Sequence, residues 1–286
     1  MKIEVFDDRV CVLGEGPLWH PVRRQFFWFD ILSHKLLSRT EHGPEEWTFD
    51  EAVSAAGWVN EDTLLIASET ALWRLDLISN NRERVVALEA NNKTSRSNDG
   101  RADPQGGFWI GTMGFNAEHA EGAIYRYFKG ELRKLFPNIT IPNAICFAPE
   151  GDCAYFTDTP TRQVMRVSLD AEGWPAAEPE VFLDLTAAGL NPDGAVVDKD
   201  GTVWLAQWGA SRVAAYARNG DFVMAFDLPA EQISCTAFGG ADLRALYVTS
   251  AAEGLSQDLI DRAPHQGKTF VIEKVGPGHP EPRVLL

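Results

Sequence analysis

The chain has 286 residues, 45% of them hydrophobic and 23% charged, which is the composition of a globular protein able to bury a large core. Its formal net charge of −15 at pH 7 disfavours nucleic acid and anionic membranes as partners, because the sequence has no strong basic patch to offset the repulsion. Symmetric all-β architectures reach this length as one core, so we expect a single domain over residues 1–286.

The first eight residues lack the continuous apolar stretch of a signal peptide, and no later segment approaches the roughly 18 apolar residues of a membrane span. We therefore expect a cytoplasmic protein. The cysteines have no Cys-x-x-Cys spacing and no neighbouring histidine cluster, which disfavours a structural zinc site and predicts reduced, mostly buried thiols. They are Cys11, Cys146, Cys153 and Cys235.

Six segments in chain order share one plan: a polar turn, a β-rich run, a small or polar break and a second β-rich run. Runs such as Phe-Phe-Trp-Phe at 26–29 carry β-forming residues between turn signals, without the 3.6-residue apolar period of helices. The β-rich parts of the six units span 26–37, 63–77, 108–127, 153–169, 202–216 and 243–271.

The repeat length indicates how these units assemble. Their central residues are Trp28, Leu65, Trp109, Tyr155, Trp204 and Tyr247, spaced by 37, 44, 46, 49 and 43 residues. A period in the forties with about four short strands per unit is typical of propeller blades. We predict an all-β, six-bladed β-propeller. Residues 2–6 are expected to pair with 269–273, because closing the ring in this way hides exposed strand edges.

Four oxygen-bearing side chains precede the aromatic centres of four units by 13, 11, 12 and 11 residues: Glu15, Asn98, Asn143 and Asp193. In a radial arrangement they would converge on the axis. Two carboxylates and two amide carbonyls suit a hard divalent cation, so the repeat predicts a metal site. The equivalent positions in the other two units lie near Ser54 and Cys235. Such an asymmetric ring leaves room for water and substrate, which favours catalysis.

Each motif taken alone has a simpler explanation, because Asn-Asp-Gly at 98–100 and Pro-Asp-Gly at 192–194 are strong turn formers. Their common phase favours the site. Arg96 would share a strand face with Asn98 and is a candidate donor to a substrate; the alternative is a surface or inter-blade ion pair. Asp99 is expected to cap a turn. No nucleophile elbow, paired His-Glu helix motif or phosphate loop is present in the sequence.

Six motifs taken together resemble the regucalcin and gluconolactonase family of metal-dependent sugar lactonases, in family order and from about residue 10 to about residue 250. They are GEGPLW at 14–19, RSNDG at 96–100, GTM at 111–113, IPN at 141–143, NPDG at 191–194 and SCTAFGG at 234–240.

The resemblance implies a six-bladed propeller that holds one divalent ion through Glu15, Asn143 and Asp193, with Asn98 close by and in contact with water or substrate. It further implies Asp193 as general base and Arg96 as the residue that holds sugar hydroxyls. Where regucalcin has a substrate-contacting glutamate after Gly-Thr-Met, this chain has Asn116, with Glu118 two residues later. That stretch is more similar to bacterial aldonolactonases, and both residues are candidate substrate contacts.

The expected reaction is hydrolysis of a sugar lactone, such as glucono- or xylonolactone, to the aldonic acid. Two other functions stay open at this stage: hydrolysis of an organophosphate or other ester at the same ion, and a non-enzymatic role as calcium-binding regulator or interaction platform. Oxygen-only ligation suits Ca²⁺, Mg²⁺ or Mn²⁺, and Zn²⁺ is compatible with three protein ligands and a water.

Overall fold

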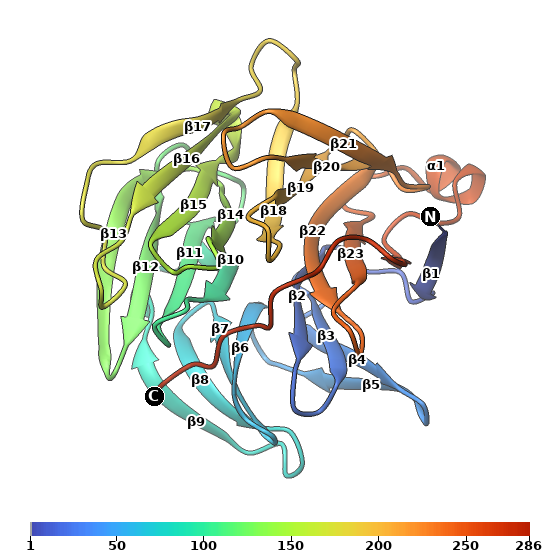
Figure 1. The fold of residues 1–286 in the computed structure, drawn as a ribbon. Coiled ribbons are helices and arrows are strands. Elements are labelled where there is room, and N and C mark those ends of the chain that lie inside the picture. Colours follow the sequence, from blue (N-terminus) through green and yellow to red (C-terminus); the bar gives the residue numbers. More distant parts are fainter. Residues whose placement is uncertain (1) are drawn as a thin grey trace.

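Six four-stranded antiparallel sheets stand around a central axis in the computed structural model, which describes residues 2–286 (Figure 1). This arrangement confirms the predicted six-bladed β-propeller. Met1, which the expected domain includes, lies outside the described residues. Each of the six β-rich units of the sequence corresponds to the two middle strands of one sheet.

In blades 1 to 5 the innermost strand comes first in the chain, and the next three strands lie progressively farther from the axis. Blade 6 follows the same order, except that its outermost strand comes from the amino terminus. Blade 1 consists of β2 (Gly14–His20), β3 (Gln25–Asp30), β4 (Lys35–Thr40) and β5 (Gly43–Thr48). Blade 2 consists of β6 (Val53–Asn60), β7 (Thr63–Ser68), β8 (Ala71–Asp76) and β9 (Arg82–Ala87). Blade 3 consists of β10 (Ser95–Ala102), β11 (Phe108–Gly114), β12 (Gly122–Phe128) and β13 (Glu131–Ile139).

The second half of the ring follows the same plan. Blade 4 consists of β14 (Pro142–Phe147), β15 (Cys153–Asp158), β16 (Gln163–Ser168) and β17 (Glu180–Asp184). Blade 5 consists of β18 (Asn191–Val197), β19 (Val203–Trp208), β20 (Arg212–Tyr216) and β21 (Phe222–Asp227). Blade 6 consists of β22 (Gln232–Gly239), β23 (Ala245–Ala251), β24 (Thr269–Ile272) and β1 (Ile3–Asp7).

The ring closes through the amino-terminal strand. β1 pairs antiparallel with β24, with Ile3 opposite Ile272 and Val5 opposite Phe270. The expected pairing of residues 2–6 with 269–273 is thus confirmed. Because β1 is the outermost strand of blade 6, it covers an edge of β24 that would otherwise be free to pair with another chain.

The hydrophobic core is divided among the blade interfaces. Alternate residues of a strand point to opposite faces, so each blade has an apolar side for each neighbour. In β3, Phe27 and Phe29 pack toward blade 2, whereas Phe26 and Trp28 pack toward blade 6. Six buried clusters result, one between each pair of adjacent blades. All four cysteines are free thiols, and Cys153 alone among them is not fully buried.

The last segment, residues 275–286, crosses one face of the ring from blade 6 to blade 2, and we call it the C-terminal strap (Figure 1). The amide of Val275 donates to the carbonyl of Arg244, and the amide of Lys199 donates to the carbonyl of Pro277. At the far side, the Val284 amide donates to the carbonyl of Trp58 at 2.9 Å. Glu281 of the strap forms an ion pair with Arg101, whose guanidinium also donates to carbonyls of blades 5 and 6. The strap therefore covers the end of the axis at which the innermost strands finish.

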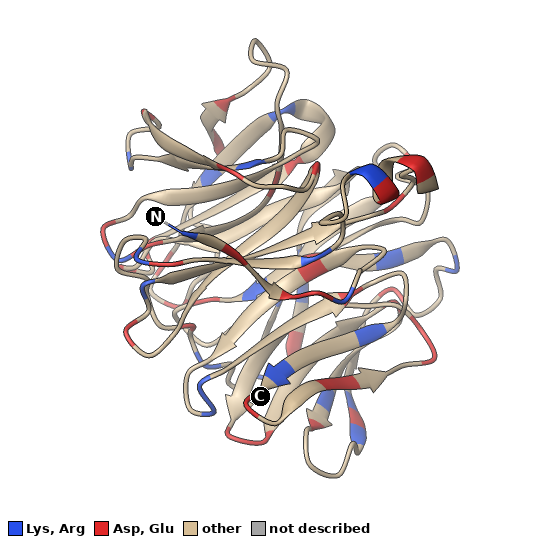
Figure 2. Ribbon diagram, turned by 90° about the vertical axis from the view of Figure 1, so that its right-hand side faces the viewer, with Lys and Arg blue, Asp and Glu red and all other residues tan. Residues whose placement is uncertain are grey.

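Charged residues of both signs are interspersed over the strands and loops on the side seen in Figure 2. The α-helix α1 (Gln257–Arg262) is short and lies between β23 and β24. No helix within residues 2–286 is long and apolar enough to cross a membrane.

Candidate functional site

The four oxygen-bearing residues of the repeat lie where the sequence places them, at corresponding points of the innermost strands of blades 1, 3, 4 and 5. Glu15, Asn98, Asn143 and Asp193 are each 4–5% exposed, and all four line one cavity of about 410 Å³. This cavity opens where the innermost strands begin, at the end of the axis opposite the C-terminal strap. We call it the axial cavity. That all four side chains line one cavity is the arrangement that the repeat predicts.

A β-bulge aims these side chains inward. In β2 the pairing with β3 shifts between Glu15 and Leu18, and in β18 the pairing with β19 shifts between Pro192 and Ala195. Every innermost strand carries such an irregularity near its start. A bulge bends a strand and re-aims a side chain without ending the strand. These motifs are therefore strand residues here rather than parts of turns.

Glycines beside two of the site residues allow neighbouring innermost strands to approach closely. Gly16 has φ +53°, and a Cβ there would lie 2.1 Å from the carbonyl oxygen of Ser54. A Cβ on Gly194 would lie 2.1 Å from Sγ of Cys235. Ser54 and Cys235, the two positions without a strong ligand, are thus packed against the backbone of an adjacent blade.

A hydrogen-bond chain sets the orientation of the Asn143 amide. The hydroxyl of Thr159 donates to the carbonyl of Pro192 at 2.8 Å, so its oxygen is free to accept from Asn143 Nδ2 at 3.0 Å. Asn143 Oδ1 therefore faces the other way and accepts from Asn98 Nδ2 at 3.0 Å. A carbonyl oxygen accepts at two lone pairs, so Asn143 Oδ1 keeps one acceptor site for the cavity.

The two carboxylates are held in an environment that opposes their ionisation. Burial, together with the charge of Asp99, raises the pKa of Glu15 to about 8. Burial and the neighbouring charge of Glu15 raise the pKa of Asp193 well above its usual value. Two buried acids with raised pKa values indicate a site whose missing positive charge is supplied by something else.

The donor set fits a divalent cation. Asp193 Oδ1 is buried and has no hydrogen-bond partner within residues 2–286. Glu15 keeps an oxygen free, because only Oε2 accepts, from the amide of Gly16 at 3.1 Å. No group of three or more His, Cys, Asp or Glu side chains in the described part of the chain is arranged around a metal position. A ligand set at this cavity would therefore have to include amide oxygens, which hard cations accept.

Arg96 is the basic side chain of the axial cavity, and it is 5% exposed. Its Nη1 donates to Asn98 Oδ1 at 2.7 Å and to the carbonyl of Ser97 at 3.0 Å. Its Nε is buried without a partner among residues 2–286. Burial lowers the pKa of Arg96, and the carboxylates of Glu253 and Glu15 oppose that shift. Arg96 thus faces the site rather than a surface ion pair, with a donor free for a ligand.

The two candidate contacts after Gly-Thr-Met are placed differently. Asn116 lines the axial cavity, whereas Glu118 does not. Glu118 is half-buried, and its carboxylate accepts from the backbone and side-chain nitrogens of Asn116 at 3.1 and 2.9 Å. Glu118 is therefore in position to hold Asn116 rather than to touch a molecule deep in the cavity.

Asp99 differs from its expected role as a turn cap. The amide of Ile145, in blade 4, donates to Asp99 Oδ2 at 2.7 Å, so Asp99 joins two innermost strands. The reason is that residues 95–102 continue as strand β10 through the bulge instead of turning. Burial raises the pKa of Asp99 to about 6.

The cavity also contains residues that the repeat did not indicate: Phe115, Thr159, Trp208 and Glu253. All four lie at, or within two residues after, the end of the second strand of blades 3 to 6. These loops and the starts of the innermost strands meet at the same end of the ring. Their place at or just after the ends of β11, β15, β19 and β23 is the signal that could have identified them.

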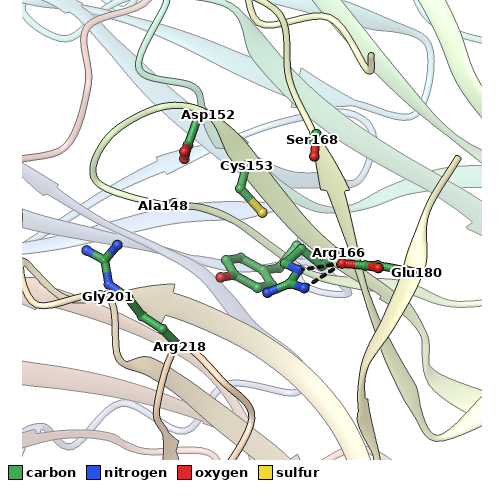
Figure 3. A pocket seen from close by; sticks show the side chains of 9 residues that line it. Ala148, Asp152, Cys153, Arg166, Ser168, Glu180, Gly201 and Arg218 are labelled. Carbon is green, nitrogen blue, oxygen red and sulfur yellow. Dashed lines mark hydrogen bonds and ion pairs between the residues drawn. The ribbon is translucent and has the colours of Figure 1, made fainter. Parts of the chain in front are cut away.

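A second cavity of about 260 Å³ lies between blades 4 and 5 and contains Cys153, Arg166 and Arg218 (Figure 3). Both guanidinium groups already have carboxylate partners: Arg166 Nε lies 3.1 Å from Glu180, and Arg218 Nη2 lies 2.6 Å from Glu150. Burial raises the pKa of the Cys153 thiol to about 11. A neutral thiol and two neutralised arginines make this cavity a poor nucleophilic or anion site.

The fold is a six-bladed propeller whose axial cavity is lined by carboxylate and amide oxygens. Residues 13–252 match the SMP-30/Gluconolactonase/LRE-like region. The chain is a member of this family.

Characterised relatives cover nearly the whole chain. An L-arabinolactonase of Azospirillum brasilense is 36% identical over 91% of this chain and 88% of its own length. A 6-deoxy-6-sulfogluconolactonase of Pseudomonas putida is 30% identical over 95% and 94%. The crystal structure of a calcium-binding protein, regucalcin, from Agrobacterium tumefaciens is 38% identical and superposes with a TM-score of 0.96, covering 99% of this chain and 97% of that one.

Proposed function

We propose that this protein hydrolyses a sugar lactone to the aldonic acid in the axial cavity, with one divalent cation held by Glu15, Asn143 and Asp193. The observation that carries the proposal is the pair of buried carboxylates, one with an unpartnered oxygen, next to a buried arginine with a free donor. Relatives named for the hydrolysis of an arabinonolactone and of a sulfonated gluconolactone support the reaction class.

A divalent cation held by these residues would offset the negative charge that raises the pKa of Glu15 and Asp193. When bound, it supplies Lewis acidity toward a carbonyl oxygen and toward water. Asn143 contributes a neutral oxygen, and Thr159 keeps that oxygen directed into the cavity. Ca²⁺, Mg²⁺, Mn²⁺ and Zn²⁺ are the ions to test, because all accept such donors.

Asp193 is the proposed general base. Its carboxylate accepts a proton as the oxygen of a water molecule forms a bond to the lactone carbonyl carbon. The ring C–O bond then breaks, and the proton passes to the former ring oxygen, which becomes a hydroxyl. Arg96 donates to the sugar hydroxyls, with its guanidinium fixed by Asn98. Asn116, held by Glu118, contributes a further polar contact near the cavity wall.

Substitution of the proposed base tests this function directly. Asp193→Asn preserves shape and removes the negative charge, so kcat/KM for glucono- or xylonolactone should fall by about 10³ or more. Asp200→Asn is the matched control, because Asp200 is exposed and follows the innermost strand of the same blade at the strap end. Chelated and remetallated protein should be assayed against both lactones and a phosphotriester.

Three results would contradict the proposal. Undiminished turnover by Asp193→Asn would exclude the base role. Faster hydrolysis of the phosphotriester than of either lactone would reassign the reaction to a different ester class. Full activity after chelation would remove the cation from the reaction.

A further inference from the structure

The charged groups of the axial cavity are unevenly distributed. Three carboxylates line it, those of Glu15, Asp193 and Glu253, against the single guanidinium of Arg96. Two of the acids belong to the proposed cation site, and a divalent cation offsets their charge. Glu253 then balances Arg96, so the loaded cavity has no cationic group left over for an anionic substituent of a substrate.

Glu253 is exposed and lies just after β23, at the rim of the cavity. No hydrogen bond or ion pair engages its carboxylate within residues 2–286; its backbone carbonyl accepts from Gln232 Nε2 at 3.0 Å, which fixes the loop. Its charge acts on Arg96, so the two groups face a common space. A free carboxylate at that place accepts hydrogen bonds from hydroxyls and repels phosphate, sulfonate or carboxylate groups.

The remaining wall is apolar. Leu13, Met113, Phe115, Ile141 and Trp208 line the cavity together with the polar residues. Trp208 is half-buried and packs against the hydrophobic cluster that contains Leu13. An aromatic face beside hydrogen-bonding groups suits the C–H side of a sugar ring. A cavity of about 410 Å³ also lies at the lower end of the range of roughly 300–1,000 Å³ for small-molecule sites, which suits a single monosaccharide.

We infer that Glu253 is a specificity-determining residue that selects lactones with an uncharged, hydroxylated tail and rejects those whose tail is anionic. This inference rests on the proposed function. In this arrangement the lactone carbonyl lies at the oxygen ligands on the axis. Glu253 then contacts the part of the sugar farthest from that carbonyl. Discrimination arises from repulsion of the wrong substrate as well as from hydrogen bonds to the right one.

The test compares glucono-1,5-lactone with its 6-phosphate, which share the reacting ring and differ in tail charge. The metal-loaded wild-type protein should prefer the neutral lactone by about 100-fold in kcat/KM, because the tail phosphate meets the Glu253 carboxylate and finds no cationic group left to pair with it. Glu253→Lys should raise kcat/KM for the phosphorylated lactone by about tenfold or more and weaken the neutral one through KM, with kcat little changed. Glu253→Gln should give an intermediate ratio.

Glu178→Lys is the matched control, because it makes the same charge change at an exposed position between β16 and β17, away from the cavity. Its substrate ratio should equal that of the wild type. An unchanged ratio in Glu253→Lys, or equal use of both lactones by the wild type, would overturn the inference while leaving the proposed function intact. Failure of the wild type to open either lactone would overturn both.

Discussion

At the scale of single residues, the site is defined by charge that the protein itself does not compensate. Glu15 and Asp193 are both buried, and their negative charges repel each other. The charge of the buried Asp99 adds to this repulsion. Their raised pKa values favour the protonated forms in the folded, metal-free chain. That contribution to stability is complete below the usual pKa of about 4.5 and is lost as pH rises toward 8.

Metal binding should therefore release protons. Adding Ca²⁺ or Mn²⁺ to the chelated protein at pH 7 should liberate about one to two protons per ion, because Glu15 and Asp193 must ionise to bind it. Weakly buffered titration with a pH indicator measures this, and Asp193→Asn should reduce the release. The unfolding free energy of the metal-free protein should also fall between pH 5 and 8, and the cation should restore it. Metal uptake without proton release would contradict the assigned protonation states.

Residues of the site differ in how far the sequence reveals them. Asn98 and Asp193 are predictable because the bulge recurs at one phase of every innermost strand. Thr159 and Glu253 were missed because the loops after the second strands vary, lying 4 and 6 residues after the central aromatics Tyr155 and Tyr247. Loop length is free to vary where no neighbouring blade packs against the loop. The spacing between a loop residue and the central aromatic residue of its blade is therefore not constant.

At the scale of the elements, β1 is the strand that completes blade 6 and thereby the ring. Phe6 lies edge-on to Phe26 and Tyr247, with ring centroids 5.5 and 5.0 Å apart. Asp7, buried at the end of β1, accepts from Arg9 and Arg39. The strand was predictable from its β-forming residues and the need to close the ring, whereas its contacts with Phe26 and Arg39 depend on blade 1, which only the folded ring brings near.

Deleting residues 1–8 should lower Tm by about 5 °C or more, because β24 loses its partner and the aromatic cluster loses Phe6. Phe6→Ala should lower Tm by a smaller amount, since it keeps the backbone pairing. Lys2→Ala serves as the control, because Lys2 lies outside β1 and is exposed. Thermal unfolding followed by circular dichroism measures all three. An unchanged Tm after the deletion would exclude β1 from the closure.

At the scale of the whole molecule, the two ends of the axis differ: the axial cavity opens at one end, and the C-terminal strap covers the other. The strap is held by its backbone and by the buried pair of Glu281 and Arg101. The sequence of 275–286 predicts no partner, because its residues do not alternate and its contacts come from blades far away in the chain.

Removing one member of that buried pair should be costly. Glu281→Ala leaves Arg101 buried and unpaired, so the unfolding free energy should fall by about 3 kcal/mol or more. Replacing both residues with methionine should recover much of the loss, since no uncompensated charge then remains. Urea denaturation measures both variants. A loss of less than about 0.5 kcal/mol for Glu281→Ala would show that the pair does not secure the strap.

The proposed metal site is tested most directly by a crystal structure of the protein grown with Mn²⁺, with anomalous scattering used to place the ion. One ion should lie on the axis, within about 2.6 Å of oxygens of Glu15, Asn143 and Asp193. No anomalous peak in the axial cavity at saturating Mn²⁺, or an ion bound without Asp193, would contradict it.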